Sequence, residues 1–151
     1  MKIDFTPFVN SMNRTFSDMV GIEITNGAYE DMTGGEMLAD VSVNIGLTGE
    51  ARASLLFTAT EHAALEITKT TTGKSDVKIS DRIVTDAMGE LLNMIVGAAQ
   101  RHANIKFDFS LPIAVEGKNH SVRSVFRSNF RRVISKMGAE EIGLYLFEDE
   151  D

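Results

Sequence analysis

Apolar residues recur at two different spacings along the chain. Near the N-terminus they recur every three or four positions, which predicts an amphipathic helix over about residues 6–19. Thr6 is the expected N-cap, Pro7 suits the first helical position, and Gly21 is expected to end the helix. The apolar positions are Phe8, Met12, Phe16 and Met19.

The spacing then changes to the two-residue alternation of strands. Residues 38–47 and 51–57 alternate on either side of residues 48–50, which predicts a β-hairpin. A shorter alternation precedes Asn26 and Gly27, which predicts a strand that ends in a turn.

Helical spacing returns in the middle of the chain. One helix is expected over about residues 59–72, with Thr58 and Glu61 as a capping box and Gly73 at its end. A longer helix is expected over about residues 81–104.

The C-terminal third again favours strands. They are expected over residues 111–115, 129–137 and 142–147. Residues 117–119 and 137–138 are expected to be turns, whereas residues 121–130 fit a strand or a helical turn equally well. The order α-β-β-β-α-α-β-β-β favours an α+β fold in a single domain over residues 1–151. It would be a largely antiparallel sheet with paired long helices packed on one face.

Composition narrows the chemistry. The 151 residues contain no cysteine, which excludes disulfides, thiolate catalysis and thiolate metal sites. The three histidines lie in no zinc-ligand spacing, and no phosphate-binding glycine loop is present.

The net charge of −7 disfavours nucleic acid and an anionic membrane as partners. The N-terminus does not resemble a secretory signal, so we expect a cytoplasmic protein.

The third predicted helix has an unusual outward surface. An advance of about 100° per residue puts Asp86, Glu90, Asn93 and Gly97 on one side, opposite a buried apolar stripe. Gly89 lies beside this group. A glycine inside a helix costs roughly 1 kcal/mol relative to alanine, so Gly89 and Gly97 favour a close approach by something. That approach could be a partner or simply packing within the fold, and the sequence leaves both open.

Glu90 and Asn93 suggest a specific chemistry because a spacing of three brings both side chains to one face of a helix. A carboxylate can bind a lysine through a charge-assisted hydrogen bond. A carboxamide can hold a water molecule in a set orientation but cannot act as a strong base. Phosphoryl hydrolysis suits such a pair, because positioning and electrostatics supply most of its catalysis. The alternative is an ordinary solvated helix face.

This helix resembles the signature helix of the CheC/CheX/FliY family of chemotaxis phosphatases, in which E-x-x-N is followed by an apolar pair and a glycine. Here these residues are Glu90, Asn93, Met94, Ile95 and Gly97. The order of the predicted elements also resembles that of the family.

The resemblance implies a phosphatase that hydrolyses the aspartyl-phosphate of a CheY-like response regulator. Glu90 would dock on the receiver's active-site lysine, and Asn93 would orient the attacking water. Asp86, Gly89 and Gly97 would belong to the surface on which the receiver docks. The Mg²⁺ would be held by the receiver, so that no cofactor is expected in this chain.

CheC-like members carry the signature on two helices, whereas residues 59–72 contain no E-x-x-N. The chain therefore resembles the CheX-like branch, which implies a homodimer. One departure is Ala98, where many members have asparagine. It leaves open a non-catalytic adaptor of the same fold, which would bind receivers without hydrolysis.

Two further features have competing interpretations. The stretch from residue 118 to 136 contains six basic residues and no acidic one, and it could guide an acidic receiver or form solvent-facing charges of a sheet. These residues are Lys118, Arg123, Arg127, Arg131, Arg132 and Lys136. His102 falls on the buried stripe of the third helix and is expected to be a core histidine. Met12 and Met19 are expected in the core.

Overall fold

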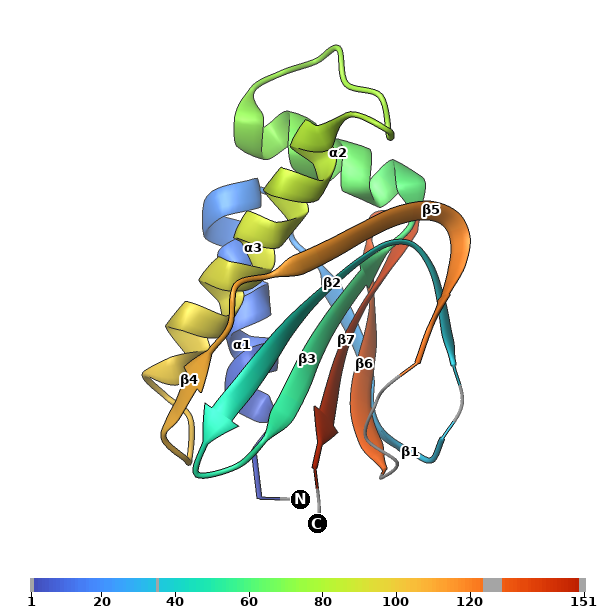
Figure 1. Ribbon diagram of the computed structural model, residues 1–151. Helices are drawn as coiled ribbons and strands as arrows, with labels where there is room; N and C mark the ends of the chain where they lie inside the picture. Colours follow the sequence, from blue (N-terminus) through green and yellow to red (C-terminus); the bar gives the residue numbers. More distant parts are fainter. Residues whose placement is uncertain (1, 35, 124–128, 150–151) are drawn as a thin grey trace.

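The computed structural model describes residues 2–34, 36–123 and 129–149. Its strands are β1 Thr25–Met32, β2 Met37–Gly49, β3 Ala53–Ala59, β4 Phe107–Phe109, β5 Ile113–Val122, β6 Phe130–Met137 and β7 Glu140–Glu148. Within the described residues they form one seven-stranded antiparallel sheet in the order β1-β6-β7-β3-β2-β4, with β5 also paired to β2. β2 and β5 are long and bend together over the top of the sheet (Figure 1).

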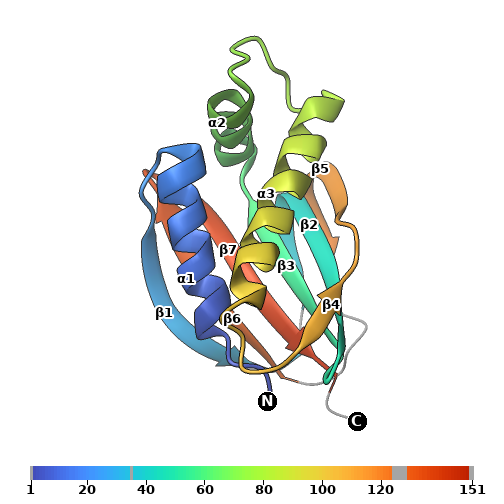
Figure 2. The same cartoon turned by 90° about the vertical axis from the view of Figure 1, so that its left-hand side faces the viewer.

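The helices lie together on one face of this sheet (Figure 2). They are α1 Thr6–Thr15, which continues as the π-helical turn η1 Phe16–Val20, α2 Glu61–Thr72 and α3 Arg82–Gln100. The main core fills the space between helices and sheet, and a smaller cluster of buried apolar residues lies apart from it. The predicted α+β fold with helices on one face is therefore confirmed.

The edge of the sheet next to α3 is built from two separate strands, β4 and β5. β4 pairs with β2 from Leu47 to Gly49, and β5 pairs with β2 from Asn44 back to Met37. The connection between them, residues 110–112, interrupts one long edge strand. Ser110 bridges the gap, because its N–H donates to the Gly46 carbonyl and its Oγ accepts from the Gly46 N–H, both at 2.9 Å.

Two predicted turns are wrong, because their residues lie inside strands. Gly27 belongs to β1, and a Cβ there would lie 2.5 Å from the Ile134 carbonyl oxygen, so a close approach between strands requires this glycine. Residues 117–119 belong to β5, where Asn119 adopts a φ of 54° next to a register shift. Turn-forming residues mark bulges in these strands rather than reversals.

Helix ends differ from the predictions by a few residues. Thr60, not Thr58, caps α2, since its Oγ1 accepts from the Ala63 N–H at 3.2 Å. Thr6 does not cap α1, which has Phe5 at its N-cap position. The predicted ends at Gly21 and Gly73 are confirmed by a left-handed φ of 74° at both glycines.

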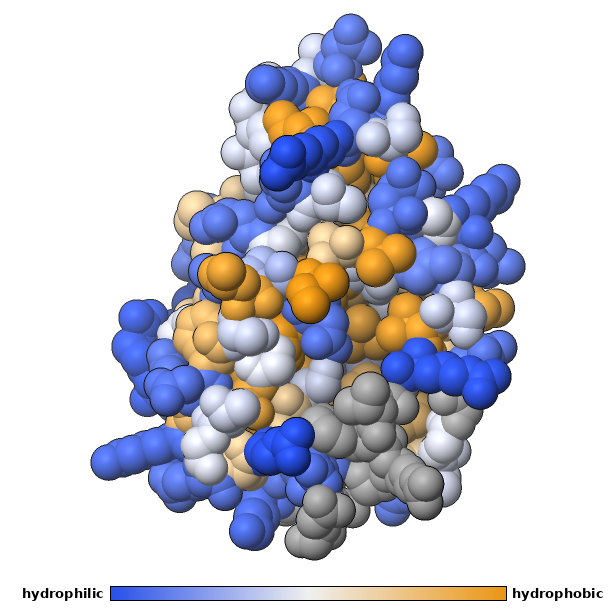
Figure 3. Space-filling view, in the orientation of Figure 1, coloured by the Kyte–Doolittle hydropathy of each residue, from blue (hydrophilic) through white to orange (hydrophobic). Residues whose placement is uncertain are grey.

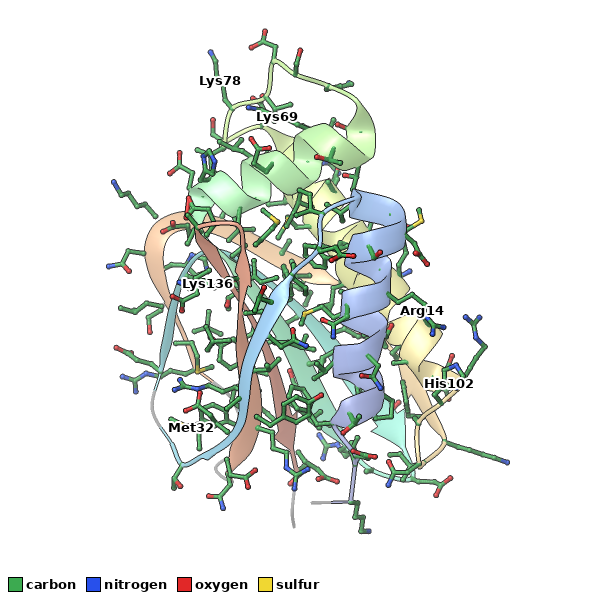
Figure 4. All side chains as sticks on the ribbon, turned by 180° about the vertical axis from the view of Figure 1, so that it is seen from behind. Arg14, Met32, Lys69, Lys78, His102 and Lys136 are labelled. Atoms are coloured by element: carbon green, nitrogen blue, oxygen red, sulfur yellow. The ribbon has the colours of Figure 1, made fainter. Side chains whose placement is uncertain are left out.

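Two residues expected in the core, His102 and Met19, are exposed. α3 ends at Gln100, so His102 is exposed and points outward rather than into the core (Figure 4). Met12 is buried as predicted, but Met19 is exposed. Of the ambiguous segment, Ser121 and Val122 complete β5, and residues 124–128 lie outside the described residues.

Candidate functional site

The packing of α3 fixes which of its residues face outward. One side of the helix is buried against the sheet and α1, and the opposite side is open. Ser11 of α1 donates a hydrogen bond from Oγ to the Ile95 carbonyl at 2.6 Å, and Gln100 Nε2 donates to the Phe107 carbonyl at 2.6 Å. These contacts tie α3 to both neighbours and set its rotation. The buried residues are Val84, Met88, Gly89, Leu91, Leu92, Ile95, Val96 and Ala99.

Glu90 and Asn93 lie on the open side, as their spacing predicted. Glu90 is exposed and Asn93 is half-buried. Side chains three apart on a helix have Cβ atoms about 5–6 Å apart, so the carboxylate and the carboxamide are immediate neighbours. Neither makes a side-chain hydrogen bond or ion pair with any part of the chain that the structure describes. Both groups are therefore available to an incoming molecule.

Asp86 lies one turn before Glu90 and is also exposed. Its carboxylate lies 3.8 Å from Arg82 Nε in an i,i+4 pair. Since both side chains are largely in solvent, this pair adds little to stability. Because the pair is weak, Asp86 can exchange Arg82 for a cationic group of another molecule.

The two glycines of α3 differ in their surroundings. Gly89 is buried, and a Cβ there would lie 3.3 Å from Pro112 Cγ. Gly97 is half-buried, and its Cβ would meet only Phe109 Cζ, at 3.8 Å. Packing against the sheet edge, the alternative that the sequence left open, accounts for Gly89. Gly97 retains an open approach.

Positions 89, 93 and 97 are four residues apart, so they form one stripe along α3. Since Gly89 meets Pro112 and Gly97 meets Phe109, this stripe runs along the connection between β4 and β5. Asn93 lies between the two glycines and faces that connection. The site is therefore a helix face bordered by an interrupted edge strand. The sequence indicated Pro112 only as the opening of a strand, and its contact with Gly89 was not foreseen.

The basic stretch does not join this site. Its described residues lie on or near β5 and β6, and four of them pair with carboxylates (Figure 4 labels Lys136 on β6). The N–O distances are 3.2 Å for Arg123–Glu36, 3.1 Å for Arg131–Asp31, 3.1 Å for Arg132–Glu30 and 3.6 Å for Lys136–Glu141. This arrangement fits solvent-facing charges of a sheet. Arg127 lies outside the described residues.

Within residues 2–34, 36–123 and 129–149, no three His, Asp or Glu side chains are grouped so that they could hold a metal ion. No helix in those ranges has the length and apolar character needed to cross a membrane.

Known chemotaxis proteins resemble this chain in sequence. A family model described as chemotaxis phosphatase CheX matches residues 41–135, a span that includes all of α3. The CheY-P phosphatase CheX of Thermotoga maritima is 26% identical over 141 residues, which cover 91% of this chain and 90% of that protein.

Solved structures match over nearly the whole chain. The chemotaxis protein CheX from Desulfovibrio desulfuricans superimposes with a TM-score of 0.85 at 26% identity, covering 95% of this chain and 97% of that one. CheX from the CheX–CheY–BeF3–Mg²⁺ complex of Borrelia burgdorferi has a TM-score of 0.77 at 19% identity, with 97% of each chain covered. At that identity the second match is evidence of a shared fold alone.

Proposed function

This chain belongs to the CheX family of chemotaxis phosphatases, and on that premise we propose that it hydrolyses the aspartyl-phosphate of a CheY-like response regulator. One observation carries the residue assignment. Glu90 and Asn93 are neighbours on the open face of α3, and neither side chain is engaged by the described part of the chain. A carboxylate and a carboxamide presented in this way are suited to recognise and enter another protein's active site.

In the proposed mechanism the two side chains divide the work. Glu90 accepts a charge-assisted hydrogen bond from the receiver's lysine and so fixes the docked orientation. Asn93 holds a water molecule in line with the acyl phosphate. The water oxygen bonds to phosphorus, the bond between phosphorus and the aspartyl oxygen breaks, and the products are inorganic phosphate and the free carboxylate. The receiver holds the Mg²⁺ that neutralises the phosphoryl oxygens.

The decisive experiment follows dephosphorylation of a phosphorylated receiver with the wild type and with Asn93→Ala. Removal of one preorganised hydrogen-bonding group typically costs about 10²–10³-fold in rate, so we expect most of the acceleration to disappear. Asn10→Ala is the matched control, because Asn10 is an exposed asparagine on α1. Glu90→Gln should chiefly raise KM, since it weakens docking.

The outcomes separate the alternatives. If the wild type accelerates no receiver of its source organism, the catalytic function is refuted. If it binds phosphorylated receivers stoichiometrically without changing their decay, the adaptor alternative suggested by Ala98 replaces it. If Asn93→Ala is as active as Asn10→Ala, the function stands and the assignment of the water-orienting residue is wrong.

We also propose that the working unit is a homodimer. The support is the CheX-like character of the chain together with two sheet edges, at β1 and at β4–β5, that each have one paired neighbour among the described strands. Light scattering at micromolar concentration should give about twice the chain mass of 16.6 kDa. A mass that stays at one chain would refute this proposal and leave the catalytic one untouched.

A further inference from the structure

The open face of α3 continues onto α1. Ser11 of α1 binds the Ile95 carbonyl of α3 at 2.6 Å, and the two helices run side by side in opposite directions (Figure 2). Arg14 follows Ser11 by three residues, so it lies on the same side of α1, about 4.5 Å further along. Because the helices are antiparallel, that step leads from the level of Ile95 back to a level between Glu90 and Asn93. Arg14 therefore lies beside the polar pair.

The side chain of Arg14 is exposed and has no partner of its own. It makes no hydrogen bond and no ion pair with the residues that the structure describes. Figure 4 shows it extending from α1 on the side where α3 lies. Packed helices have axes about 8–10 Å apart, so its guanidinium borders the open face of α3. An arginine placed in this way is available to an anionic group of an incoming molecule.

A second free arginine lies on α3 itself. Arg101 has right-handed helical dihedral angles, φ −72° and ψ −19°, so it continues the helical path beyond Gln100. It follows Gly97 by four residues and therefore shares the open face. It is exposed and, like Arg14, unpaired within the described residues. Along the helix axis it lies about 12 Å from Asn93.

Charge, rather than apolar area, distinguishes this face. In Figure 3 hydrophobic residues gather over β5, and hydrophilic ones project at the left-hand border, toward α3. Glu90 is acidic whereas Arg14 and Arg101 are basic, and Asn93 lies between Glu90 and Arg101 along the helix. Asp4, near the start of α1, forms an ion pair with neither arginine. The face is therefore divided into an acidic and a basic part, with Asn93 between them.

We propose that Arg14 and Arg101 belong to the surface on which the receiver docks, where they bind carboxylates beside its phosphorylated aspartate. This inference rests on the proposed function and adds two cationic contacts to Glu90 and Asn93. A receiver that holds Mg²⁺ needs carboxylate ligands, so the surroundings of its reactive centre are acidic. Its lysine would meet Glu90 while its acidic groups meet the arginines, and this charge pattern favours one docked orientation.

The size of a protein interface brings both arginines within reach of the receiver. A standard interface buries about 800 Å² per partner, which corresponds to a disc of about 16 Å radius. Arg101 is about 12 Å from Asn93 along α3, and Arg14 is on the adjacent helix at nearly the same level as Asn93. A folded domain that delivers its reactive group to Asn93 therefore covers both arginines.

The kinetic expectation for the arginines differs from that for Asn93. Charges at the border of an interface act on the association rate and its salt dependence, so their loss should raise KM and leave kcat unchanged. The screening length falls from about 10 Å at about 0.1 M salt to about 3 Å at about 1 M, so the rise in KM should shrink as salt is added. Loss of Asn93 should instead lower kcat at every salt concentration.

The test compares Arg14→Glu and Arg101→Glu with Lys118→Glu, which changes the net charge equally. Lys118 is exposed, and its neighbour Asn119 binds Asp40 beside the start of α2, not beside α3. An exposed ion pair changes an equilibrium constant by up to about fivefold. At low salt we expect Arg14→Glu to raise KM for the phosphorylated receiver about fivefold, Arg101→Glu to raise it less, and Lys118→Glu to leave it near the wild-type value. The dissociation constant for a beryllofluoride-activated receiver should rise in parallel.

Two conservative variants separate charge from packing. Arg14→Lys retains the positive charge and should stay near the wild-type affinity, whereas Arg14→Gln removes it and should bind more weakly. Lysine and glutamine are both good helix formers, so neither variant should disturb α1. If Arg14→Lys and Arg14→Gln are impaired equally, Arg14 does not act through its charge and the proposal is wrong.

Three results with an active wild type would also overturn the proposal. In the first, Arg14→Glu matches Lys118→Glu in KM and in receiver affinity. In the second, the effect of Arg14→Glu is undiminished in about 1 M salt. In the third, Arg14→Glu lowers kcat at saturating receiver, which would mean that it disturbs Asn93.

A wild type without phosphatase activity would refute the proposed function instead. The affinities of the same variants for the beryllofluoride-activated receiver then test the two arginines by themselves. A wild type that binds no receiver would refute both proposals.

Discussion

Replacing Gly97 by alanine should stabilise the fold and at the same time impair docking. A glycine inside a helix costs about 1 kcal/mol relative to alanine. A Cβ at position 97 would meet only Phe109 Cζ at 3.8 Å, an ordinary van der Waals distance. We therefore expect Gly97→Ala to raise the free energy of unfolding by about 1 kcal/mol, or about 2–4 °C in Tm for a chain of this size.

Gly89→Ala is the matched comparison, because the same atoms are added to the same helix. Here the Cβ would lie 3.3 Å from Pro112 Cγ and 3.6 Å from its Cβ. The proline ring cannot rotate away, so the start of β5 must move. Overpacking of this kind costs about 1–3 kcal/mol, which offsets the gain in helix propensity. We expect no net gain for Gly89→Ala.

Urea unfolding of both variants and the wild type gives the two differences directly. Equal stabilisation by both variants would refute the contact between Gly89 and Pro112, and destabilisation by Gly97→Ala would refute the open surroundings of Gly97. The dephosphorylation assay then tests docking. If Gly97 must be small for the receiver to approach, its alanine variant should be more stable and yet less active. Full activity would remove Gly97 from the docking surface.

Three further variants test other parts of the structure. Asp40→Ala should lower the free energy of unfolding by about 1–3 kcal/mol in urea, with Asp76→Ala as an inert control, because Asp40 accepts from the N–H groups of Asn119 at 2.8 Å and Glu61 at 2.9 Å. Gly143→Ala should cost about 1–3 kcal/mol, and an unchanged unfolding midpoint would refute this, since its Cβ would lie 2.7 Å from Thr58 Oγ1. Burial raises the pKa of Tyr145, and its hydrogen bond with Thr58 offsets part of that rise. An unfolded tyrosine loses its phenol proton at about pH 10, whereas the folded chain keeps the Tyr145 proton above that pH. Stability should therefore be undiminished below pH 10 and fall as pH rises through the folded value. An ultraviolet titration should show the Tyr145 phenol transition above pH 10, and that transition should be absent in Tyr145→Phe.

The sequence predicted the elements that have strong periodicity and missed those that depend on partners distant in the chain. α3 and the hairpin of β2 and β3 have clear periods, and both were predicted. β4 has three residues, too few for any period, and it exists because it pairs with the end of β2. His102 shows that periodicity can also predict too much. The apolar pattern continues past Gln100, where α3 ends, so His102 was placed in a helix that does not reach it.

The same division holds within the candidate site. Helical spacing alone puts Glu90 and Asn93 on one face, so their proximity could be predicted. The contact of Pro112 with Gly89 joins two elements, and that of Ser110 with Gly46 joins residues 64 apart. Such contacts depend on the sheet order, which no local pattern contains. The sequence therefore predicted the polar pair but not the edge that borders it.

The position of the site at a sheet edge follows from what an edge strand tolerates. Proline has no N–H to donate, so Pro112 would break the ladder of a central strand, whereas an edge strand can leave that direction open. Ser110 restores the pairing with Gly46 that the interruption would otherwise lose. The break at residues 110–112 thus costs few hydrogen bonds, and it lets the proline ring reach Gly89 on α3. Closing the break with a regular strand would remove that contact, so the interruption itself shapes the edge that borders Asn93.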